Sequence, residues 1–240
     1  MRAMITGDPS VQEFSDVLLQ VGNGQISRDD EGFIEIPQSL TNKVDTRAQL
    51  LESVYPGLEE KSRLGREYHE WLCERAILAP KNDIVNEINT TILGQLPGNT
   101  VQFKSFDKTI EESEAVNFPV EFLNSQNPSG LPQHDLKLKV GAPIILLRNL
   151  DAPRLCNGTR LCITALKRNL IEAVILTGCA KNTTVLIPRI PVLGKDLPFP
   201  FKRVQFPVRL AFSMTINKSQ GQSLKVMGSD LETPCFSHGQ

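Results

Sequence analysis

A short apolar run followed at once by a dense polar cluster constrains this chain more than any other feature. The apolar run spans residues 208–214. The polar cluster surrounds Gly221 and contains Thr215, Asn217, Lys218, Ser219, Gln220, Gln222 and Ser223. Such a strand would place many hydrogen-bond donors at the carboxyl edge of a sheet, where open α/β sheets bind ligands. Short polar side chains with one cation suit a sugar-phosphate backbone better than an apolar ligand. A purely structural interpretation stays open, in which the strand leads into a helix capped by Thr215 or Asn217.

A second strand–turn–helix pattern lies earlier in the chain. The apolar residues 76–79 indicate a buried strand that ends at Pro80, and Lys81 and Asn82 follow it. Asp83 is predicted to cap the next helix, which carries apolar residues at helical spacing as far as Ile92. This order of apolar strands and helices indicates a parallel α/β sheet. Further helices are predicted over residues 10–21, 46–54 and 64–75.

The sequence changes to short β-strands after residue 135. Five strands are predicted, at residues 136–140, 143–147, 159–165, 170–177 and 183–188. Strands this short, separated by turn residues, indicate a small β-barrel. The polar and acidic residues 100–135 are expected to form a linker or a long hairpin. Residues 204–214 are expected to return to the parallel sheet.

Charge is distributed very unevenly along a chain whose net charge is −1. Residues 1–136 contain 11 Lys and Arg against 22 Asp and Glu, whereas residues 137–225 contain 15 against 3. A basic half on a neutral chain is typical of a protein with a polyanionic partner. The alternative is that the acidic half packs beside the basic half and neutralises it.

Composition excludes several other classes of protein. No apolar run approaches the roughly 20 residues that a membrane span requires, so no membrane partner is expected. The amino terminus lacks the apolar core of a signal peptide, which predicts an intracellular protein. The 5 cysteines form no Cys-x-x-Cys pair and the 3 histidines are scattered, so no metal site is expected.

The polar cluster also carries a family resemblance. Thr-Ile-Asn-Lys-Ser-Gln-Gly-Gln-Ser, preceded by Pro-Val-Arg-Leu-Ala-Phe, resembles the fifth conserved motif of superfamily-one DNA helicases. It is most similar to the Pif1 family, which includes the helicases of Helitron transposons. Residues 136–150 and 156–160 resemble the SH3-like insertion of that family. The resemblance implies a RecA-like, P-loop NTPase-type α/β lobe over residues 1–117 and 191–240, interrupted by a small SH3-like β-barrel at residues 118–190.

The resemblance also assigns roles to residues. It implies that Thr215, Asn217, Lys218 and Ser219 hold the phosphates of a DNA strand, and that Gln220, Gly221 and Gln222 lie nearer the nucleotide. Arg2 would be the arginine that reaches the γ-phosphate, although it is equally readable as a frayed terminal residue. Further candidates for nucleic-acid contacts are Lys81, Asn82, Arg148, Asn149, Asn157 and Arg160. Arg148 and Arg160 are open to a second interpretation as solvated charges on a strand face, and Asn157-Gly158 as a hairpin turn.

Parts of the helicase machinery are missing from these residues. The phosphate-binding pattern Gly-x-x-x-x-Gly-Lys-Ser/Thr does not occur, and no apolar strand runs into an acidic pair. The family's sixth motif is also absent, so no complete catalytic set is predicted. ATP and Mg²⁺ are cofactors of the intact family enzyme, and neither is expected to bind tightly to this chain alone.

The function expected from the resemblance is the C-terminal portion of an ATP-dependent 5′-to-3′ DNA helicase. The expected partners are single-stranded DNA and a first RecA-like lobe, and the nucleus is the expected location. Genome maintenance and rolling-circle transposition are the processes that the family serves. Two alternatives stay open: a stand-alone nucleic-acid-binding module that uses the basic barrel, and an inert product that does not fold stably by itself.

Overall fold

The computed structural model describes residues 9–27, 29–32, 34–37, 40–111, 113, 116–128, 130–194, 199 and 201–233. The chain divides into two compact units, one within the first 49 residues and the other from Leu50 onward. The first unit is built around helix α1 (Pro9–Gly22), which confirms the helix predicted over residues 10–21. The helix begins at Pro9, a residue suited to a first turn because it lacks an N–H group. No helix in the described ranges is long and apolar enough to cross a membrane.

A group of helices follows, the first of which crosses from residues 47–49 of the first unit into the second unit. These are α2 (Arg47–Val54), α3 (Leu58–Lys61) and α4 (Arg66–Cys73), so the helices predicted over residues 46–54 and 64–75 are confirmed. Tyr68 and Leu72 of α4 are buried, and the Trp71 ring lies 5.9 Å from that of Tyr68. The aromatic face of α4 is therefore part of the core.

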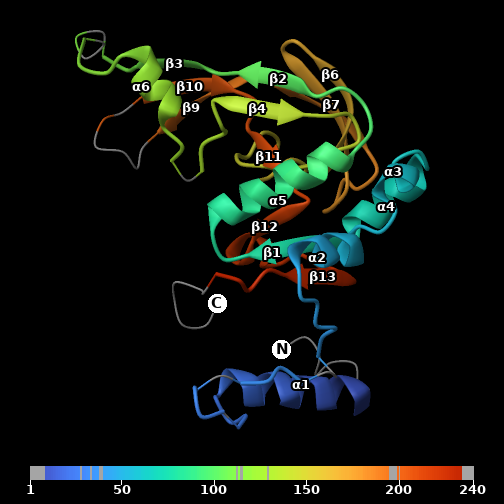
Figure 1. Ribbon diagram of the computed structural model, residues 1–240. Coiled ribbons are helices and arrows are strands. Elements are labelled where there is room, and N and C mark those ends of the chain that lie inside the picture. The colour runs from blue at the N-terminus through green and yellow to red at the C-terminus, as the bar shows by residue number, and fades with distance from the viewer. Residues whose placement is uncertain are drawn as a thin grey trace. The chain divides into compact units, whose positions relative to one another are not determined.

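A three-stranded parallel sheet follows, as the sequence predicts. Its strand order is β12-β1-β13, with β1 at Arg75–Ala79, β12 at Ser213–Thr215 and β13 at Val226–Ser229. Helix α5 (Asn82–Gln95) leaves the carboxyl end of β1 and packs on β12 (Figure 1). The predicted cap at Asp83 is wrong, because Lys81 precedes the first helical residue and makes no side-chain cap bond.

The predicted short strands are confirmed, and most of them share one antiparallel sheet. Its order is β11-β5-β6-β7-β8. The strands are β11 (Val208–Leu210), β5 (Pro143–Leu146), β6 (Arg160–Lys167), β7 (Leu170–Ile175) and β8 (Thr184–Pro188). The remaining predicted strand, β4 (Asp135–Leu138), pairs instead with β2 (Val101–Lys104).

A further antiparallel sheet has the order β3-β10-β9. Its strands are β3 (Phe106–Thr109), β10 (Phe201–Gln205) and β9 (Ile190–Gly194), and helix α6 (Val120–Ser125) packs on it. The prediction of a linker or long hairpin over residues 100–135 is therefore wrong. Polar strands in this stretch find their partners far away in the chain, as Asp107 does opposite Arg203.

The predicted return to the parallel sheet over residues 204–214 is correct only for β12. Strands β10 and β11 pair in antiparallel sheets, so the apolar run at 208–214 is divided between two sheets. The domain boundaries at 117/118 and 190/191 stay predictions. Because β2, β3, β10 and β11 all pair in antiparallel sheets, we propose that the insertion extends from about residue 100 to about residue 210.

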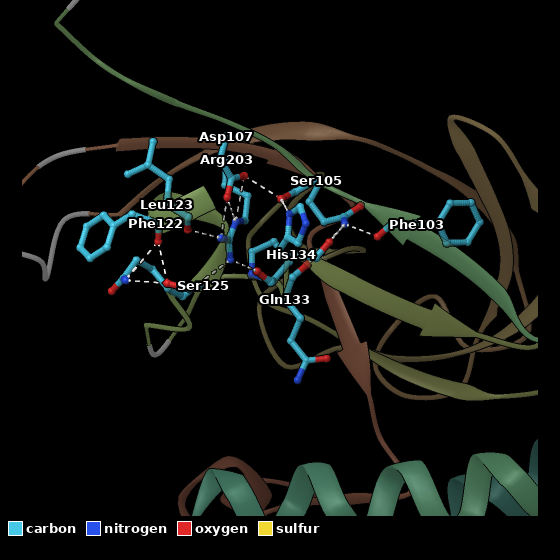
Figure 2. Close-up of polar contacts among 12 residues, drawn as sticks. Phe103, Ser105, Asp107, Phe122, Leu123, Ser125, Gln133, His134 and Arg203 are labelled. Carbon is cyan, nitrogen blue, oxygen red and sulfur yellow. Dashed lines mark hydrogen bonds and ion pairs between the residues drawn. The ribbon is translucent and has the colours of Figure 1, made fainter. Parts of the chain in front are cut away.

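A buried ion pair holds the β3-β10-β9 sheet to the segments around it (Figure 2). Arg203 of β10 and Asp107 of β3 are completely buried, and Arg203 Nη2 lies 2.6 Å from Asp107 Oδ2. The guanidinium also donates to the carbonyls of Leu123, Gln126 and Pro132, each at 3.0 Å. Loss of either partner would leave an uncompensated buried charge, so the fold depends on both residues being present.

The Asp107 carboxylate is fixed from its other side. Ser105 Oγ donates to Asp107 Oδ1 at 2.6 Å, and His134 Nδ1 lies 2.8 Å from the same hydroxyl. Because an ionised carboxylate can only accept, we infer that Ser105 donates its proton to Asp107 and that Nδ1 of His134 donates to Ser105. The network therefore ties β3 to the segment that leads into β4.

Replacing Asp107 by Asn is expected to lower the free energy of unfolding by about 3–5 kcal/mol, because it leaves the Arg203 guanidinium buried without its counter-charge. Urea unfolding followed by circular dichroism measures the change. The matched control is Asp135→Asn, whose side chain is about 40% exposed and should matter by less than about 1 kcal/mol. Equal losses in the two variants would show that the buried pair has no special role.

Candidate nucleic-acid interface

A cleft of about 640 Å³ opens at the carboxyl ends of β1 and β12. Ala79 pairs with Thr215 in the register of these parallel strands, so the turns that follow them lie side by side. The residues around residue 146 of β5 line the cleft as well. Five of the residues predicted to contact nucleic acid line it: Lys81, Asn82, Thr215, Asn217 and Lys218. The two polar patterns recognised in the sequence therefore meet in one place.

An amide side chain holds β12 in position at the sheet edge. Asn89 of α5 accepts from the Ser213 backbone N–H at 2.9 Å and donates to the Ser213 carbonyl at 2.9 Å. The Asn89 side chain thus makes the two backbone hydrogen bonds with Ser213 that a neighbouring strand would otherwise make. It fixes the direction in which β12 delivers Thr215 to the cleft.

The polar cluster itself forms a single 3₁₀ turn. The turn spans Ile216–Ser219, and Thr215 precedes it without a side-chain cap bond. Ser219 donates its hydroxyl to the Ile216 carbonyl at 2.7 Å, whereas Asn217 and Lys218 are exposed. The structural interpretation, in which Thr215 or Asn217 caps a helix, is therefore not supported. The Thr215, Asn217 and Lys218 side chains are not occupied by capping.

Two contacts connect the polar cluster to the turn before β6. Lys218 Nζ donates to Asn157 Oδ1 at 3.3 Å, and Gln222 Nε2 donates to the Gly158 carbonyl at 3.2 Å. Asn149 accepts from the Asn157 backbone N–H at 2.7 Å, so its side chain shapes this turn. The predicted residues Asn149 and Asn157 thus lie beside the cluster.

Arg148 follows Leu147, which lines the cleft, and is itself half-buried. Its Nη1 donates to the Leu147 carbonyl at 3.4 Å, and it lies beside Gly130, another residue of the cleft lining. Arg148 thus lies next to the cleft, and its role in nucleic-acid binding stays a prediction.

The residues predicted to lie near a nucleotide offer an incomplete site. Gln220 and Gly221 are exposed, and Gly221 has a φ of +80°, which a side chain would strain. Gln222 is engaged with Gly158, and the three residues bring no charge. Arg2 lies outside the described residues. These groups alone do not fit a triphosphate, and the described part of the chain contains no cluster of three acidic, His or Cys side chains for Mg²⁺.

The assignment of Arg160 to a nucleic-acid channel is corrected by the structure. Arg160 is completely buried. Its guanidinium donates to the carbonyls of Leu72, Cys73, Arg75 and Ala211, at 3.0–3.4 Å. Burial lowers its pKa, since desolvation disfavours the charged form. A side chain in this position supports the fold and does not reach a ligand.

The charge asymmetry therefore overstates the positive surface of the chain. Lys139 and Arg203 are also buried, and Lys139 donates to the carbonyls of Gly94 and Leu96. Part of the positive charge of residues 137–225 thus serves internal hydrogen bonds. Only the exposed remainder is available to a polyanion.

Arg209 is a cleft residue that the sequence analysis did not single out. It lines the cleft from β11, and its Nη1 lies 3.4 Å from Asn82 Oδ1. Its Nη2 donates to the Leu131 carbonyl at 2.9 Å, and burial lowers its pKa. The signal in the sequence was a single arginine within an apolar strand. With Lys81 and Lys218 it gives the cleft three cations against one carboxylate, that of Asp83.

Comparison with known proteins agrees with this geometry. Residues 121–166 match the family model described as DNA helicase Pif1, 2B domain. The ATP-dependent DNA helicase PIF1 of Rattus norvegicus is 32% identical over 151 residues, which are 61% of this chain and 22% of that protein. The human PIF1 is 30% identical over 151 residues, with the same shares of both chains. The chain is therefore similar to part of the Pif1 DNA helicases, and residues 121–166 resemble their 2B domain.

Solved Pif1 structures show the same fold. The Pif1 helicase of Candida albicans superposes with a TM-score of 0.56 at 22% identity, over 95% of this chain and 49% of that chain. The Bacteroides Pif1 in complex with ADP-AlF3 and ssDNA gives a TM-score of 0.56 at 21% identity, over 95% and 44%. The predicted fold class, a RecA-like α/β lobe with a β-rich insertion, is confirmed. The chain spans less than a quarter of the length of the curated Pif1 relatives.

Replacing Arg160 by Lys is expected to lower the free energy of unfolding by roughly 1.5–3 kcal/mol or more, because one ammonium cannot satisfy carbonyls on three segments. The salt dependence of nucleic-acid binding should not change, since Arg160 is buried. Chemical unfolding and fluorescence anisotropy measure the two quantities, with Arg148→Lys as the half-buried control. A folded Arg160→Gln chain that binds nucleic acid with a reduced salt slope would restore Arg160 as a binding residue.

Proposed function

We propose that this chain is the second-lobe portion of an ATP-dependent 5′-to-3′ DNA helicase and that its cleft binds single-stranded DNA. The observation that carries the proposal is the meeting of Lys81 and Asn82 with Thr215, Asn217 and Lys218 in one cleft. The similarity to Pif1 helicases supports it, including the Bacteroides protein whose structure is described as a complex with ssDNA.

The cleft has the chemistry that a sugar-phosphate backbone requires. Its hydroxyl and amide groups are short hydrogen-bond partners, and Lys81, Arg209 and Lys218 supply positive charge. Contacts of this kind position a strand without reading its sequence. Each phosphate that a cation neutralises releases counterions, so the affinity falls as salt rises.

The strand would also compete for the hydrogen bonds that the cluster makes within the chain. Lys218 donates a hydrogen bond to the side-chain amide oxygen of Asn157, and Arg209 donates one to that of Asn82. Both acceptors are neutral. Phosphate oxygens form stronger, charge-assisted hydrogen bonds with such cations than amides do. We therefore propose that a bound strand takes over these donors from Asn157 and Asn82, within the cleft.

Gln220, Gly221 and Gln222 would contribute to one wall of an ATP site in the intact enzyme, and the role of Arg2 at the γ-phosphate stays a prediction of the resemblance. The phosphate loop and the Mg²⁺ ligands would come from a first RecA-like lobe, a partner that these 240 residues do not include. DNA repair, recombination, telomere maintenance, Helitron transposition and a nuclear location are proposals that follow from the family.

A stand-alone nucleic-acid-binding module is the second candidate. The exposed Lys167 and Arg168, where β6 turns into β7, favour it, because they present charge away from buried carbonyls. The burial of Arg160 weakens it. The two candidates differ in which cations the affinity depends on.

The cleft is tested by fluorescence anisotropy of a labelled oligonucleotide of roughly 20 nucleotides, at several salt concentrations. Thr215→Ala combined with Lys218→Ala is expected to weaken binding at least about tenfold, because hydrogen bonds to charged groups contribute about 1.5–3 kcal/mol each. The salt slope should fall by about 0.7, because one cation fewer neutralises a phosphate of the strand. The control pair is Lys167→Ala with Arg168→Ala. Loss of binding in the control pair and not in the cleft pair would favour the stand-alone module.

We expect the chain alone to show no ATP hydrolysis with Mg²⁺, because loss of even one charge-stabilising arginine can cost on the order of 10³-fold or more. Phosphate release is measured with and without single-stranded DNA. A DNA-stimulated rate above that of a Thr215→Ala/Lys218→Ala control would contradict this expectation and show that the 240 residues contain a complete site.

A further inference from the structure

The β3-β10-β9 sheet has two faces of opposite character. Its inner face carries Asp107, Phe201 and Arg203, and Leu123 of α6 packs there. Because side chains alternate along a strand, the intervening residues lie on the outer face. These are Phe106, Lys108, Pro191, Leu193, Lys202 and Val204.

Two lysines stand directly opposite each other on this outer face. The strand register pairs Lys108 of β3 with Lys202 of β10. Like charges in this position destabilise a sheet. Among the residues that the structure describes, no carboxylate lies within 4.0 Å of either ammonium group. The pair therefore gives this face two adjacent cations.

An aromatic ring lies one row away from the lysine pair. Phe106 is paired with Val204 and is 66% exposed, whereas most phenylalanines are buried. Leu193, opposite Lys202 on the other side, is 43% exposed. The outer face thus combines an accessible ring, apolar neighbours and paired cations, with none of its six residues acidic.

The strands beneath the outer face are anchored from the inner side of the sheet. Lys202 and Val204 flank Arg203, which is bonded to Asp107 and to three carbonyls on the inner side (Figure 2). The backbone positions that carry the ring and the lysines are consequently held from the inner side of the sheet. A preorganised surface loses less conformational entropy on binding.

We propose that this outer face is a second nucleic-acid-binding surface, on which bases of a single strand stack on Phe106 and phosphates lie beside Lys108 and Lys202. Exposed aromatic rings next to cations are the usual means of holding single strands without reading their sequence. A duplex keeps its base faces stacked inside, so it would use the lysines and not the ring. None of the six residues belongs to the cleft lining, so this surface is distinct from the site proposed above.

The test uses the full chain in two backgrounds, the parent and the Thr215→Ala/Lys218→Ala variant. Phe106→Ala is introduced into both, and affinity is measured by anisotropy for a normal strand and for an abasic strand of equal length. Loss of one stacked base is expected to weaken binding of the normal strand roughly 5- to 150-fold and to leave the abasic strand unchanged. Leu186→Ala, an exposed apolar residue of β8, is the matched control.

A second variant tests the lysines. Lys108→Gln with Lys202→Gln is expected to reduce the salt slope by about 1.4, since two cations fewer neutralise phosphates of a single strand. Its urea midpoint should be equal to or above that of the parent, because a repulsion has been removed. Weaker binding by a chain of equal or higher stability cannot arise from damage to the fold.

The outcomes separate the two sites. An unchanged affinity and salt slope in the folded variants would overturn the outer-face proposal, and so would an equal loss of affinity for normal and abasic strands. Stronger competition by a duplex than by a single strand would overturn it as well. The cleft proposal fails independently, if Thr215→Ala/Lys218→Ala binds as the parent does.

Discussion

One buried guanidinium, that of Arg160, connects the two kinds of sheet in this chain. Arg160 belongs to β6 of the antiparallel sheet. Its guanidinium donates to carbonyls at the end of α4, at the start of β1 and between β11 and β12. As far as the structure describes the chain, Arg160 forms no ion pair with a carboxylate, and the carbonyl groups that accept its hydrogen bonds compensate for the lost hydration. Because one wall of the cleft comes from β5 and the other from the ends of β1 and β12, the width of the cleft depends on this junction.

Local sequence patterns were sufficient for elements whose signal lies within a few residues. The apolar run before Pro80, the helix after it and the short strands from β4 to β8 were all predicted from such patterns. Five polar residues on two separate segments were also expected at the carboxyl edge of one sheet, and the cleft contains them. That inference succeeded because parallel strands align their carboxyl ends.

Other features depend on partners distant in the sequence and were missed. An arginine that binds DNA and an arginine that binds buried carbonyls look the same in a sequence, so Arg160 was assigned to the wrong group. The strand at Asp107 carries the alternation of a half-buried strand but pairs with residues near Arg203, and its polar neighbourhood indicated a linker. Arg209 was missed because it lies within an apolar run, which indicated a buried strand and not a residue of the cleft.

The central position of β1 has a consequence for how the chain is made. Both neighbours of β1 in the parallel sheet are synthesised long after it. Ile77, for example, pairs with Ser213, which is added to the chain 136 residues later. At about 5–20 residues per second, this is a delay of roughly 7–27 s on the ribosome. During that time a strand that is completely buried in the finished protein has neither of its edges paired. Strands β5 to β8 can pair first, since they follow one another in the sequence. Strand β1 is the segment of the nascent chain most in need of protection from aggregation.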